Sequence, residues 1–115
     1  MARQLKTNTK IDDFIAKVIN EAHHHASAVE RVIKPLSDEV RNRLDLSVDT
    51  IAVYERNGQL ARTCWVVLSG KRYVFSYNYS KKQIVLRDHT LRGRERFSFD
   101  NNTPLTDIVG EVAKL

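Results

Sequence analysis

Three consecutive histidines, His23 to His25, are the side chains that most directly suggest chemistry, because imidazole is a common metal ligand. Neighbouring positions on a helix point about 100° apart, so three adjacent imidazoles cannot converge on one ion. A helical pair of ligands needs a spacing of three or four residues, which no histidine or cysteine supplies. We therefore expect no metal and no cofactor, and a polar or partly buried helix face at these positions.

Cys64 is the only cysteine, which excludes a disulfide within the chain and fits a reducing compartment. Strand alternation directs Cys64 toward the core and His89 away from it, so we interpret the thiol as apolar and unreactive. The acids Asp88 and Glu95 lie among arginines, where we expect ion pairs rather than acid–base chemistry. No catalytic residue is assigned, and the sequence favours a protein that is not an enzyme.

Positive charge gathers in the second half of the chain. Residues 71–96 hold eight Lys or Arg against two acids, whereas residues 11–50 hold eight acids against five bases. Four arginines of this segment are candidate binding residues: Arg72, Arg87, Arg94 and Arg96. Arginines can neutralise phosphates, and the single tryptophan, Trp65, can stack on a base. The same asymmetry can pair two subunits or keep strand edges soluble, so all three interpretations remain open.

The first third of the chain has helical periodicity. Apolar residues recur every three or four positions over residues 11–33, which predicts one long helix with a single buried stripe. Thr9 is the expected N-cap, and Pro35 is the expected end, because proline lacks an N–H. Ser37 then begins a short second helix over residues 38–44.

Residues 50–100 contain eight of the nine aromatic residues and predict four or five short antiparallel strands separated by turns. The turns are Asn57-Gly58, Ser69-Gly70 and Ser80–Lys82. Two-residue turns place four pairs opposite one another: Ile51 and Cys64, Val66 and Tyr73, Cys64 and Phe75, Tyr77 and Ile84. One face then carries the core side chains, which are Ile51, Val53, Cys64, Val66, Leu68, Tyr73, Phe75, Tyr77, Ile84 and Leu86. We expect the long helix to cover that face.

The opposite face of this meander is half apolar. Its candidate ligand-binding or partner-binding residues are Tyr54, Trp65, Arg72, Val74, Arg87 and His89, joined by Arg94 and Arg96. A C-terminal helix, a second subunit or a ligand should cover such a face. Thr103 as N-cap and Pro104 at the first position signal that helix, which is too short to cover both this face and its own apolar stripe. We therefore expect a homo-oligomer, most simply a twofold dimer.

Length and composition predict one domain over residues 1–115, with a flexible basic N-terminus at residues 1–9. A content of 42% apolar residues can build a core, and a net charge of +5 favours acidic partners without specifying one. The N-terminus lacks an apolar signal segment, and no apolar run approaches the length of a membrane span. We therefore expect a cytoplasmic protein without membrane association.

The stretch GKRYVFSYNY at residues 70–79, followed by QIVLRDH at residues 83–89, resembles the final strands of RelE/ParE-type bacterial toxins. That resemblance implies a small basic α+β protein that cleaves mRNA on the ribosome. The residues to test would be Arg87, His89, Arg92 and Arg94. The chain departs from the family by a long extra strand before the match, and by the lack of a tyrosine shortly after His89.

The layout of the whole chain is similar to that of proteins of unknown role carried by bacterial integron gene cassettes. A helix laid across a meander is also similar to cystatin-like and nuclear-transport-factor-like folds, which implies a pocket between helix and sheet. Our prediction is a non-catalytic binding module that associates with itself through the half-apolar, basic sheet face. The alternatives are a RelE/ParE-like ribosome-dependent mRNA endonuclease toxin and a binder of single-stranded nucleic acid.

Overall fold

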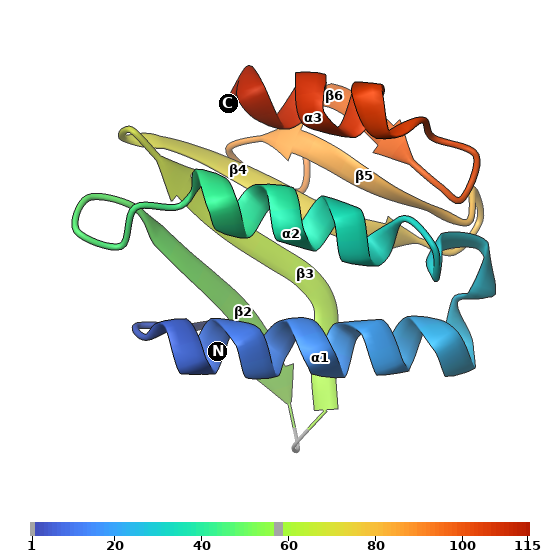
Figure 1. The fold of residues 1–115 in the computed structure, drawn as a ribbon, viewed down its shortest axis with the longest axis horizontal. Coiled ribbons are helices and arrows are strands. Elements are labelled where there is room, and N and C mark those ends of the chain that lie inside the picture. Colours follow the sequence, from blue (N-terminus) through green and yellow to red (C-terminus); the bar gives the residue numbers. More distant parts are fainter. Residues whose placement is uncertain (1, 57–58) are drawn as a thin grey trace.

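The computed structural model describes residues 2–56 and 59–115, with side chains described at all of these except 2–3, 25, 54–56 and 59–62. Its helices are α1 (Asn8–His25), a 3-10 turn η1 (Ser27–Val29), α2 (Ile33–Arg43) and α3 (Leu105–Ala113). Its strands are β1 (Ala2–Gln4), β2 (Thr50–Arg56), β3 (Gln59–Leu68), β4 (Lys71–Asn78), β5 (Gln83–Asp88) and β6 (Glu95–Phe99). The predicted α+β class, with helices before and after an antiparallel meander, is confirmed (Figure 1).

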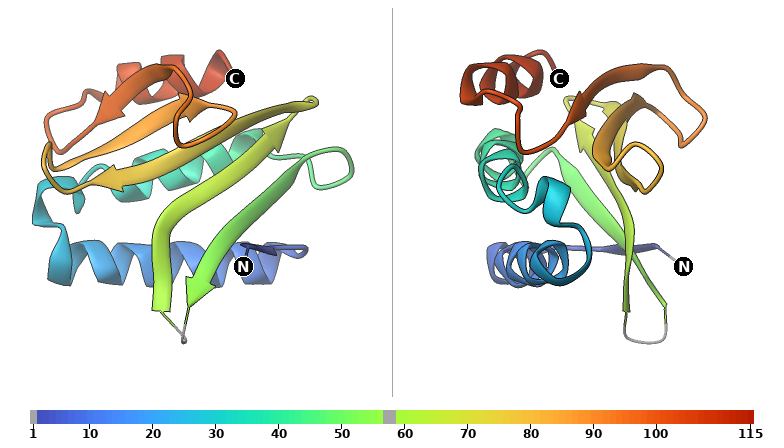
Figure 2. Two further views of the ribbon diagram at one scale, coloured as in Figure 1. Left: turned by 180° about the vertical axis from the view of Figure 1, so that it is seen from behind. Right: turned by 90° about the vertical axis from the view of Figure 1, so that its right-hand side faces the viewer.

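The strands form one antiparallel sheet in the order β1-β2-β3-β4-β5-β6, and the three α-helices lie on one side of it (Figure 2). Strand β1 was not expected, because residues 1–9 were predicted to be flexible. Residues Ala2–Gln4 instead pair with β2, and the backbone N–H of Leu5 donates to the carbonyl of Ile51 over 2.8 Å. Leu5 is 1% exposed, so this segment closes one edge of the core.

Strand registers follow the predicted two-residue period along most of the sheet. Three predicted pairs are confirmed: Val66 with Tyr73, Cys64 with Phe75, and Tyr77 with Ile84. The predicted core face is confirmed as well, because its side chains belong to the hydrophobic cluster beneath the helices. Successive side chains of a strand point to opposite faces of the sheet. Once one face is buried, the alternation of apolar and polar residues therefore predicts which side chains lie in the core.

One predicted pair is wrong. Ile51 lies opposite Val66, and Cys64 lies opposite Val53, because the β2–β3 pairing is irregular between Val53 and Glu55. The shift amounts to two residues, so every side chain keeps its face even though its partner changes. The predicted turn at Asn57-Gly58 lies outside the described residues.

The predicted long helix ends earlier than expected, and the predicted second helix begins earlier, at Ile33. Helix α1 ends at His25, and Ala26 leaves the helical region with φ −145° and ψ 58°. Pro35 does not end a helix but lies in the first turn of α2, where the N–H that proline lacks would have no helical partner. Ser37 is inside α2 and does not begin it.

The side chain of Asn101, from the connection between β6 and α3, holds the chain between α1 and α2. Its oxygen accepts from the backbone N–H of Arg31 at 2.8 Å and of Val32 at 3.3 Å, and its nitrogen donates to the carbonyl of Ser27 at 2.7 Å. The backbone N–H of Asn101 also donates to Ala28 over 3.0 Å. These bonds satisfy backbone groups that a continuous helix would have paired internally.

Two predicted helix caps are displaced. Thr7, not Thr9, caps α1, and its hydroxyl accepts from the backbone N–H of Lys10 over 3.2 Å. Pro104, not Thr103, precedes the first residue of α3. The hydroxyl of Thr103 turns back and accepts from the backbone N–H of Asp100.

Helix α3 packs beside α2 on the same side of the sheet (Figure 2). Its residues Ile108 and Val112, and Leu115 after its end, are buried in the common core, whereas Leu105 and Val109 are 59% and 41% exposed. The C-terminal helix therefore does not cover the opposite face of the sheet. Among the described helices, none is long and apolar enough to cross a membrane.

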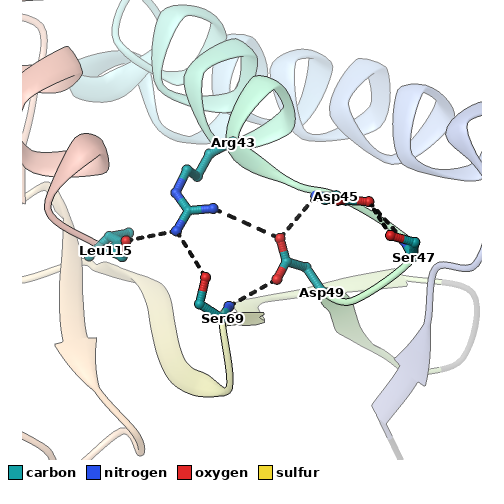
Figure 3. Close-up of polar contacts among 6 residues, drawn as sticks. All are labelled: Arg43, Asp45, Ser47, Asp49, Ser69 and Leu115. Carbon is teal, nitrogen blue, oxygen red and sulfur yellow. Dashed lines mark hydrogen bonds and ion pairs between the residues drawn. The ribbon is translucent and has the colours of Figure 1, made fainter.

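A polar network joins the end of α2 to the β3–β4 turn and the end of α3 (Figure 3). The Asp49 carboxylate is buried and accepts from the backbone N–H groups of Asp45 and Ser69, each over 2.9 Å. The Arg43 guanidinium lies 3.9 Å from Asp49 and donates to the main-chain oxygen of Leu115 over 3.0 Å. The network fixes the helices against the strands at this end of the core.

Candidate interaction site

The outer face of the sheet, on the side without helices, is built from three rows of side chains across the strands. The central row follows from the registers and contains Ala52, Trp65, Val74, Arg87 and Glu95, one from each of the strands β2 to β6. It is flanked by a row with Thr50, Val67 and Arg72, and by a row with Thr63, Ser76, Val85 and Ser98. The central row changes from apolar to charged as it crosses the sheet.

Val74 and Val85 are fully buried, although no helix lies over them. Arginine side chains of the same face lie close to its apolar residues. The guanidinium carbon of Arg72 lies 5.8 Å from the centre of the Trp65 ring, and the Arg87 side chain is only 19% exposed. Arginine stems can cover apolar surface while their charged heads stay in water. Trp65 and Val67 remain partly exposed, which leaves a small apolar area between these arginines.

The predicted ion pairing of the two acids is confirmed. Glu95 accepts from Arg87 over 2.9 Å and lies 3.6 Å from the ammonium of Lys81. Asp88 accepts from Arg96 over 2.9 Å and lies 3.6 Å from Arg94. The carboxylates thereby neutralise charge that would otherwise be open to phosphate groups.

Two of the four candidate arginines do not belong to the outer face. The guanidinium of Arg96 lies 5.5 Å from the centre of the Tyr73 ring, which is part of the helix-covered core. Arg94 is exposed in the connection that follows β5. An irregularity of the β5–β6 pairing between Leu86 and Arg87 separates these arginines from the central row. The structure therefore groups Arg72 and Arg87 with Trp65 and Val74, but not with Arg94 and Arg96.

The connection between β5 and β6 explains this separation. His89 takes a positive φ of 64°, and its backbone N–H donates to the carbonyl of Arg72 over 2.9 Å. Gly93 passes so close to Asp88 that a Cβ there would lie 1.7 Å from the Asp88 carbonyl oxygen. The resulting tight loop holds Arg94 next to Asp88. His89 is exposed at the start of this loop, beside the row that contains Arg72.

Other candidate chemistry is not assembled at this face. Cys64 lies on the helix side of the sheet opposite Phe75, and burial raises the pKa of its thiol to about 12. His23 pairs with Glu30 over 3.0 Å. Among the described residues, no three His, Cys, Asp or Glu side chains gather closely enough to hold a metal ion. The side chain of Tyr54 lies outside the described part of the chain.

Sequence reasoning missed Glu95, Ala52 and Ser98 as members of this face. The positions of Glu95 and Ser98 depend on the β5–β6 pairing, which the turns alone do not fix, whereas Ala52 was predictable from its place between Ile51 and Val53. The ion pair between Glu95 and Arg87 could have been predicted, because the two residues were expected in neighbouring strands.

A family model described as "Integron cassette protein VCH_CASS1 chain" matches residues 11–109. The matched range includes α1, α2, the strands β2 to β6 and the first half of α3. A comparison with curated proteins found no match.

Proposed function

The chain belongs to this family of integron cassette proteins, and we propose that it is a small non-catalytic binding module that associates with itself through the outer sheet face. The observation that carries the proposal is the position of Trp65 and Val67, which are partly exposed on a face that none of the described helices covers. The occupant we propose is a second copy of the chain, related by a twofold axis. The lone cysteine fits a reducing bacterial cytoplasm as the place where this occurs.

The distribution of charge supports a second copy as the partner. A twofold interface brings the same patch of both subunits together, so the patch must be complementary to itself. The charged residues Arg72, Arg87 and Glu95 lie on β4 to β6, at one side of the apolar Trp65 on β3. In a twofold contact the apolar parts of two copies can meet at Trp65, with the Arg87–Glu95 ion pair of each copy at the rim.

The ion pairs make phosphate the less suitable partner. A nucleic-acid surface gains affinity by releasing counterions, which requires cations that no protein carboxylate has already neutralised. Arg87 is bound to Glu95, whereas Arg94 and Arg96 are held by Asp88. Of the residues that the toxin resemblance implies as functional, Arg87 lies on the outer face, whereas His89, Arg92 and Arg94 lie in the connection between β5 and β6.

The fluorescence of Trp65, the only tryptophan, tests self-association at the proposed contact. Dilution of the protein through the micromolar range should shift its emission to longer wavelength, because dissociation exposes the indole to water. The Val67→Lys variant should show the emission of the diluted wild type at every concentration. An emission maximum that does not change with dilution in the wild type contradicts the proposal.

A further inference from the structure

A cavity of about 610 Å³ lies between α1, α2 and the helix-covered face of the sheet. Its walls are mostly apolar and include Phe14 and Val18 of α1, Leu36 and Val40 of α2, and Phe75 and Tyr77 of β4. Figure 1 shows α1 running below α2 and passing in front of the lower parts of β2 and β3. The cavity is distinct from the outer face, because the sheet lies between them.

The volume is too large for a packing defect. Protein interiors are packed as densely as organic crystals, and voids larger than a water molecule are few. Sites for small molecules typically measure about 300–1,000 Å³. The cavity therefore has the size of a small-molecule site. Its presence explains why some apolar side chains of the core are incompletely buried.

The exposure of the apolar side chains along α1 shows which part of the helix is not packed against other atoms of the core. Ile11 near the start of the helix and Ala22 near its end are buried in the core. Phe14, Ile15 and Val18 lie on the same stripe between them but remain partly exposed, and all three line the cavity. Ile11 and Ala22 also line the cavity but are buried, so the incompletely buried part of the stripe is the middle of α1.

Contacts at both ends of α1 keep it from closing onto the sheet. At the start, Leu5 is bound to β2, and the guanidinium of Arg41 on α2 donates to Asp12 over 3.1 Å. At the other end, His23 pairs with Glu30 over 3.0 Å. Asn101 fixes the connection that follows. Because both ends are held, the space is present before any ligand arrives, which lowers the cost of binding.

The lining indicates the chemistry of the occupant. Among the side chains that the structure describes, the carboxylate and the guanidinium of the lining are Glu21, which is exposed, and Arg41, which is engaged with Asp12. The Tyr77 and Tyr79 rings meet edge to face with centres 4.8 Å apart, and the exposed Tyr79 marks the open side. A charged ligand would lose its hydration without an ionic partner in the interior. A neutral apolar body with a polar end at the tyrosines matches these walls.

We infer that this cavity binds a small uncharged molecule, aromatic or aliphatic, with its apolar body between Phe14, Val18 and Phe75 and a polar end near Tyr77. A peptide helix is excluded by size, because a helix with its side chains is about 10 Å wide and would have to displace α1. A second copy is likewise unsuited, since α1 and α2 wall the space from the helix side.

N-phenyl-1-naphthylamine, a neutral dye that fluoresces in apolar surroundings, is the probe that tests this inference. Added to the full chain, it should show a saturable increase in emission with one site per protein. The Val18→Trp variant fills the cavity and should weaken binding at least tenfold. The Val109→Trp variant, with the same change at an exposed valine of α3, should bind as the wild type does. Circular dichroism establishes that each variant is folded.

A second readout on the wild-type chain does not depend on any variant. Cys64 lines the same cavity, so saturating dye should slow its alkylation by iodoacetamide at least fivefold. Loss of the dye signal in Val18→Trp together with protection of Cys64 supports the site. The inference is overturned if the wild type shows no saturable signal, if Val18→Trp folds and binds as tightly as Val109→Trp, or if the dye leaves alkylation unchanged. Failure here would leave self-association through the outer face unaffected.

Discussion

The carboxylate of Asp49 accepts a 2.9 Å hydrogen bond from the backbone N–H of Ser69, which follows it by 20 residues. Its second oxygen accepts from the backbone N–H of Asp45, also over 2.9 Å, and the carboxylate is 4% exposed. One buried side chain thus ties the segment after α2 to the β3–β4 turn (Figure 3). Because Arg43 approaches the same group, its charge is compensated where water is excluded.

The Asp49→Asn variant should be less stable than the wild type by about 1–3 kcal/mol, because asparagine has one acceptor oxygen and leaves a buried N–H unpaired. Chemical denaturation measures the difference. Asp45→Asn is the matched control, since Asp45 is exposed and one of its oxygens accepts both bonds from Ser47. Equal stability of Asp49→Asn and Asp45→Asn would show that the buried network does not hold the fold.

The Asn101→Ala variant should lose about 1–2 kcal/mol of unfolding free energy, because it removes three bonds to the connection between α1 and α2. Hydrogen exchange should also become faster at Arg31 and Val32, whose N–H groups lose their acceptor. Asn102→Ala is the control, because the backbone N–H that Asn102 donates to Asp100 survives the change. Unchanged exchange at Arg31 and Val32 would contradict the role given to Asn101.

The sequence determined the faces of the strands better than it determined the helices. Period-two alternation alone placed Val66, Phe75 and Leu86 on the helix-covered side, and a register shift of two residues left that assignment intact. A break between two helices was predicted, but at Pro35; its position at Ala26 was not, because Asn101, which holds the connection there, lies about 70 residues further along the chain. Local propensity favoured a continuous helix, and a distant side chain overrode it.

Side-chain alternation also made part of the candidate site predictable. Alternation placed Trp65, Val74 and Arg87 on one face, and the structure keeps them in one row. The separation of Arg94 and Arg96 from that row depends on the irregular β5–β6 pairing and on the tight approach of Gly93 to Asp88. Neither feature leaves a periodic signal in the sequence.

Cys64 should react slowly in the folded protein, because burial raises the pKa of its thiol from 9.0 to about 12. At pH 8 the thiolate fraction is therefore much smaller in the folded protein than in urea, and alkylation by iodoacetamide should be slower in the folded protein, though still measurable. Between about pH 9 and pH 12 the unfolded chain loses a proton that the folded chain retains, so stability should fall as pH rises. A Cys64→Ala variant should lack this part of the pH dependence. Equal alkylation rates in buffer and urea would contradict the buried thiol.

Short single-stranded RNA should not quench Trp65 at low salt, because carboxylates already hold Arg87, Arg94 and Arg96. A fluorescence titration measures this directly. The Glu95→Gln variant is the informative comparison, since it frees Arg87 and Lys81 and should raise any residual affinity. Quenching of the wild type that weakens steeply with added salt would instead favour a nucleic-acid surface.

The mass of the protein in solution tests the central claim, self-association through the outer sheet face, most directly. Sedimentation equilibrium at low micromolar concentration should give the wild type a mass well above the 13.3 kDa of one chain. Val109→Lys, at the exposed face of α3, should keep that mass, whereas Val67→Lys should reduce it to 13.3 kDa. A wild type that sediments as 13.3 kDa, or a loss of association in Val109→Lys alone, would contradict the account.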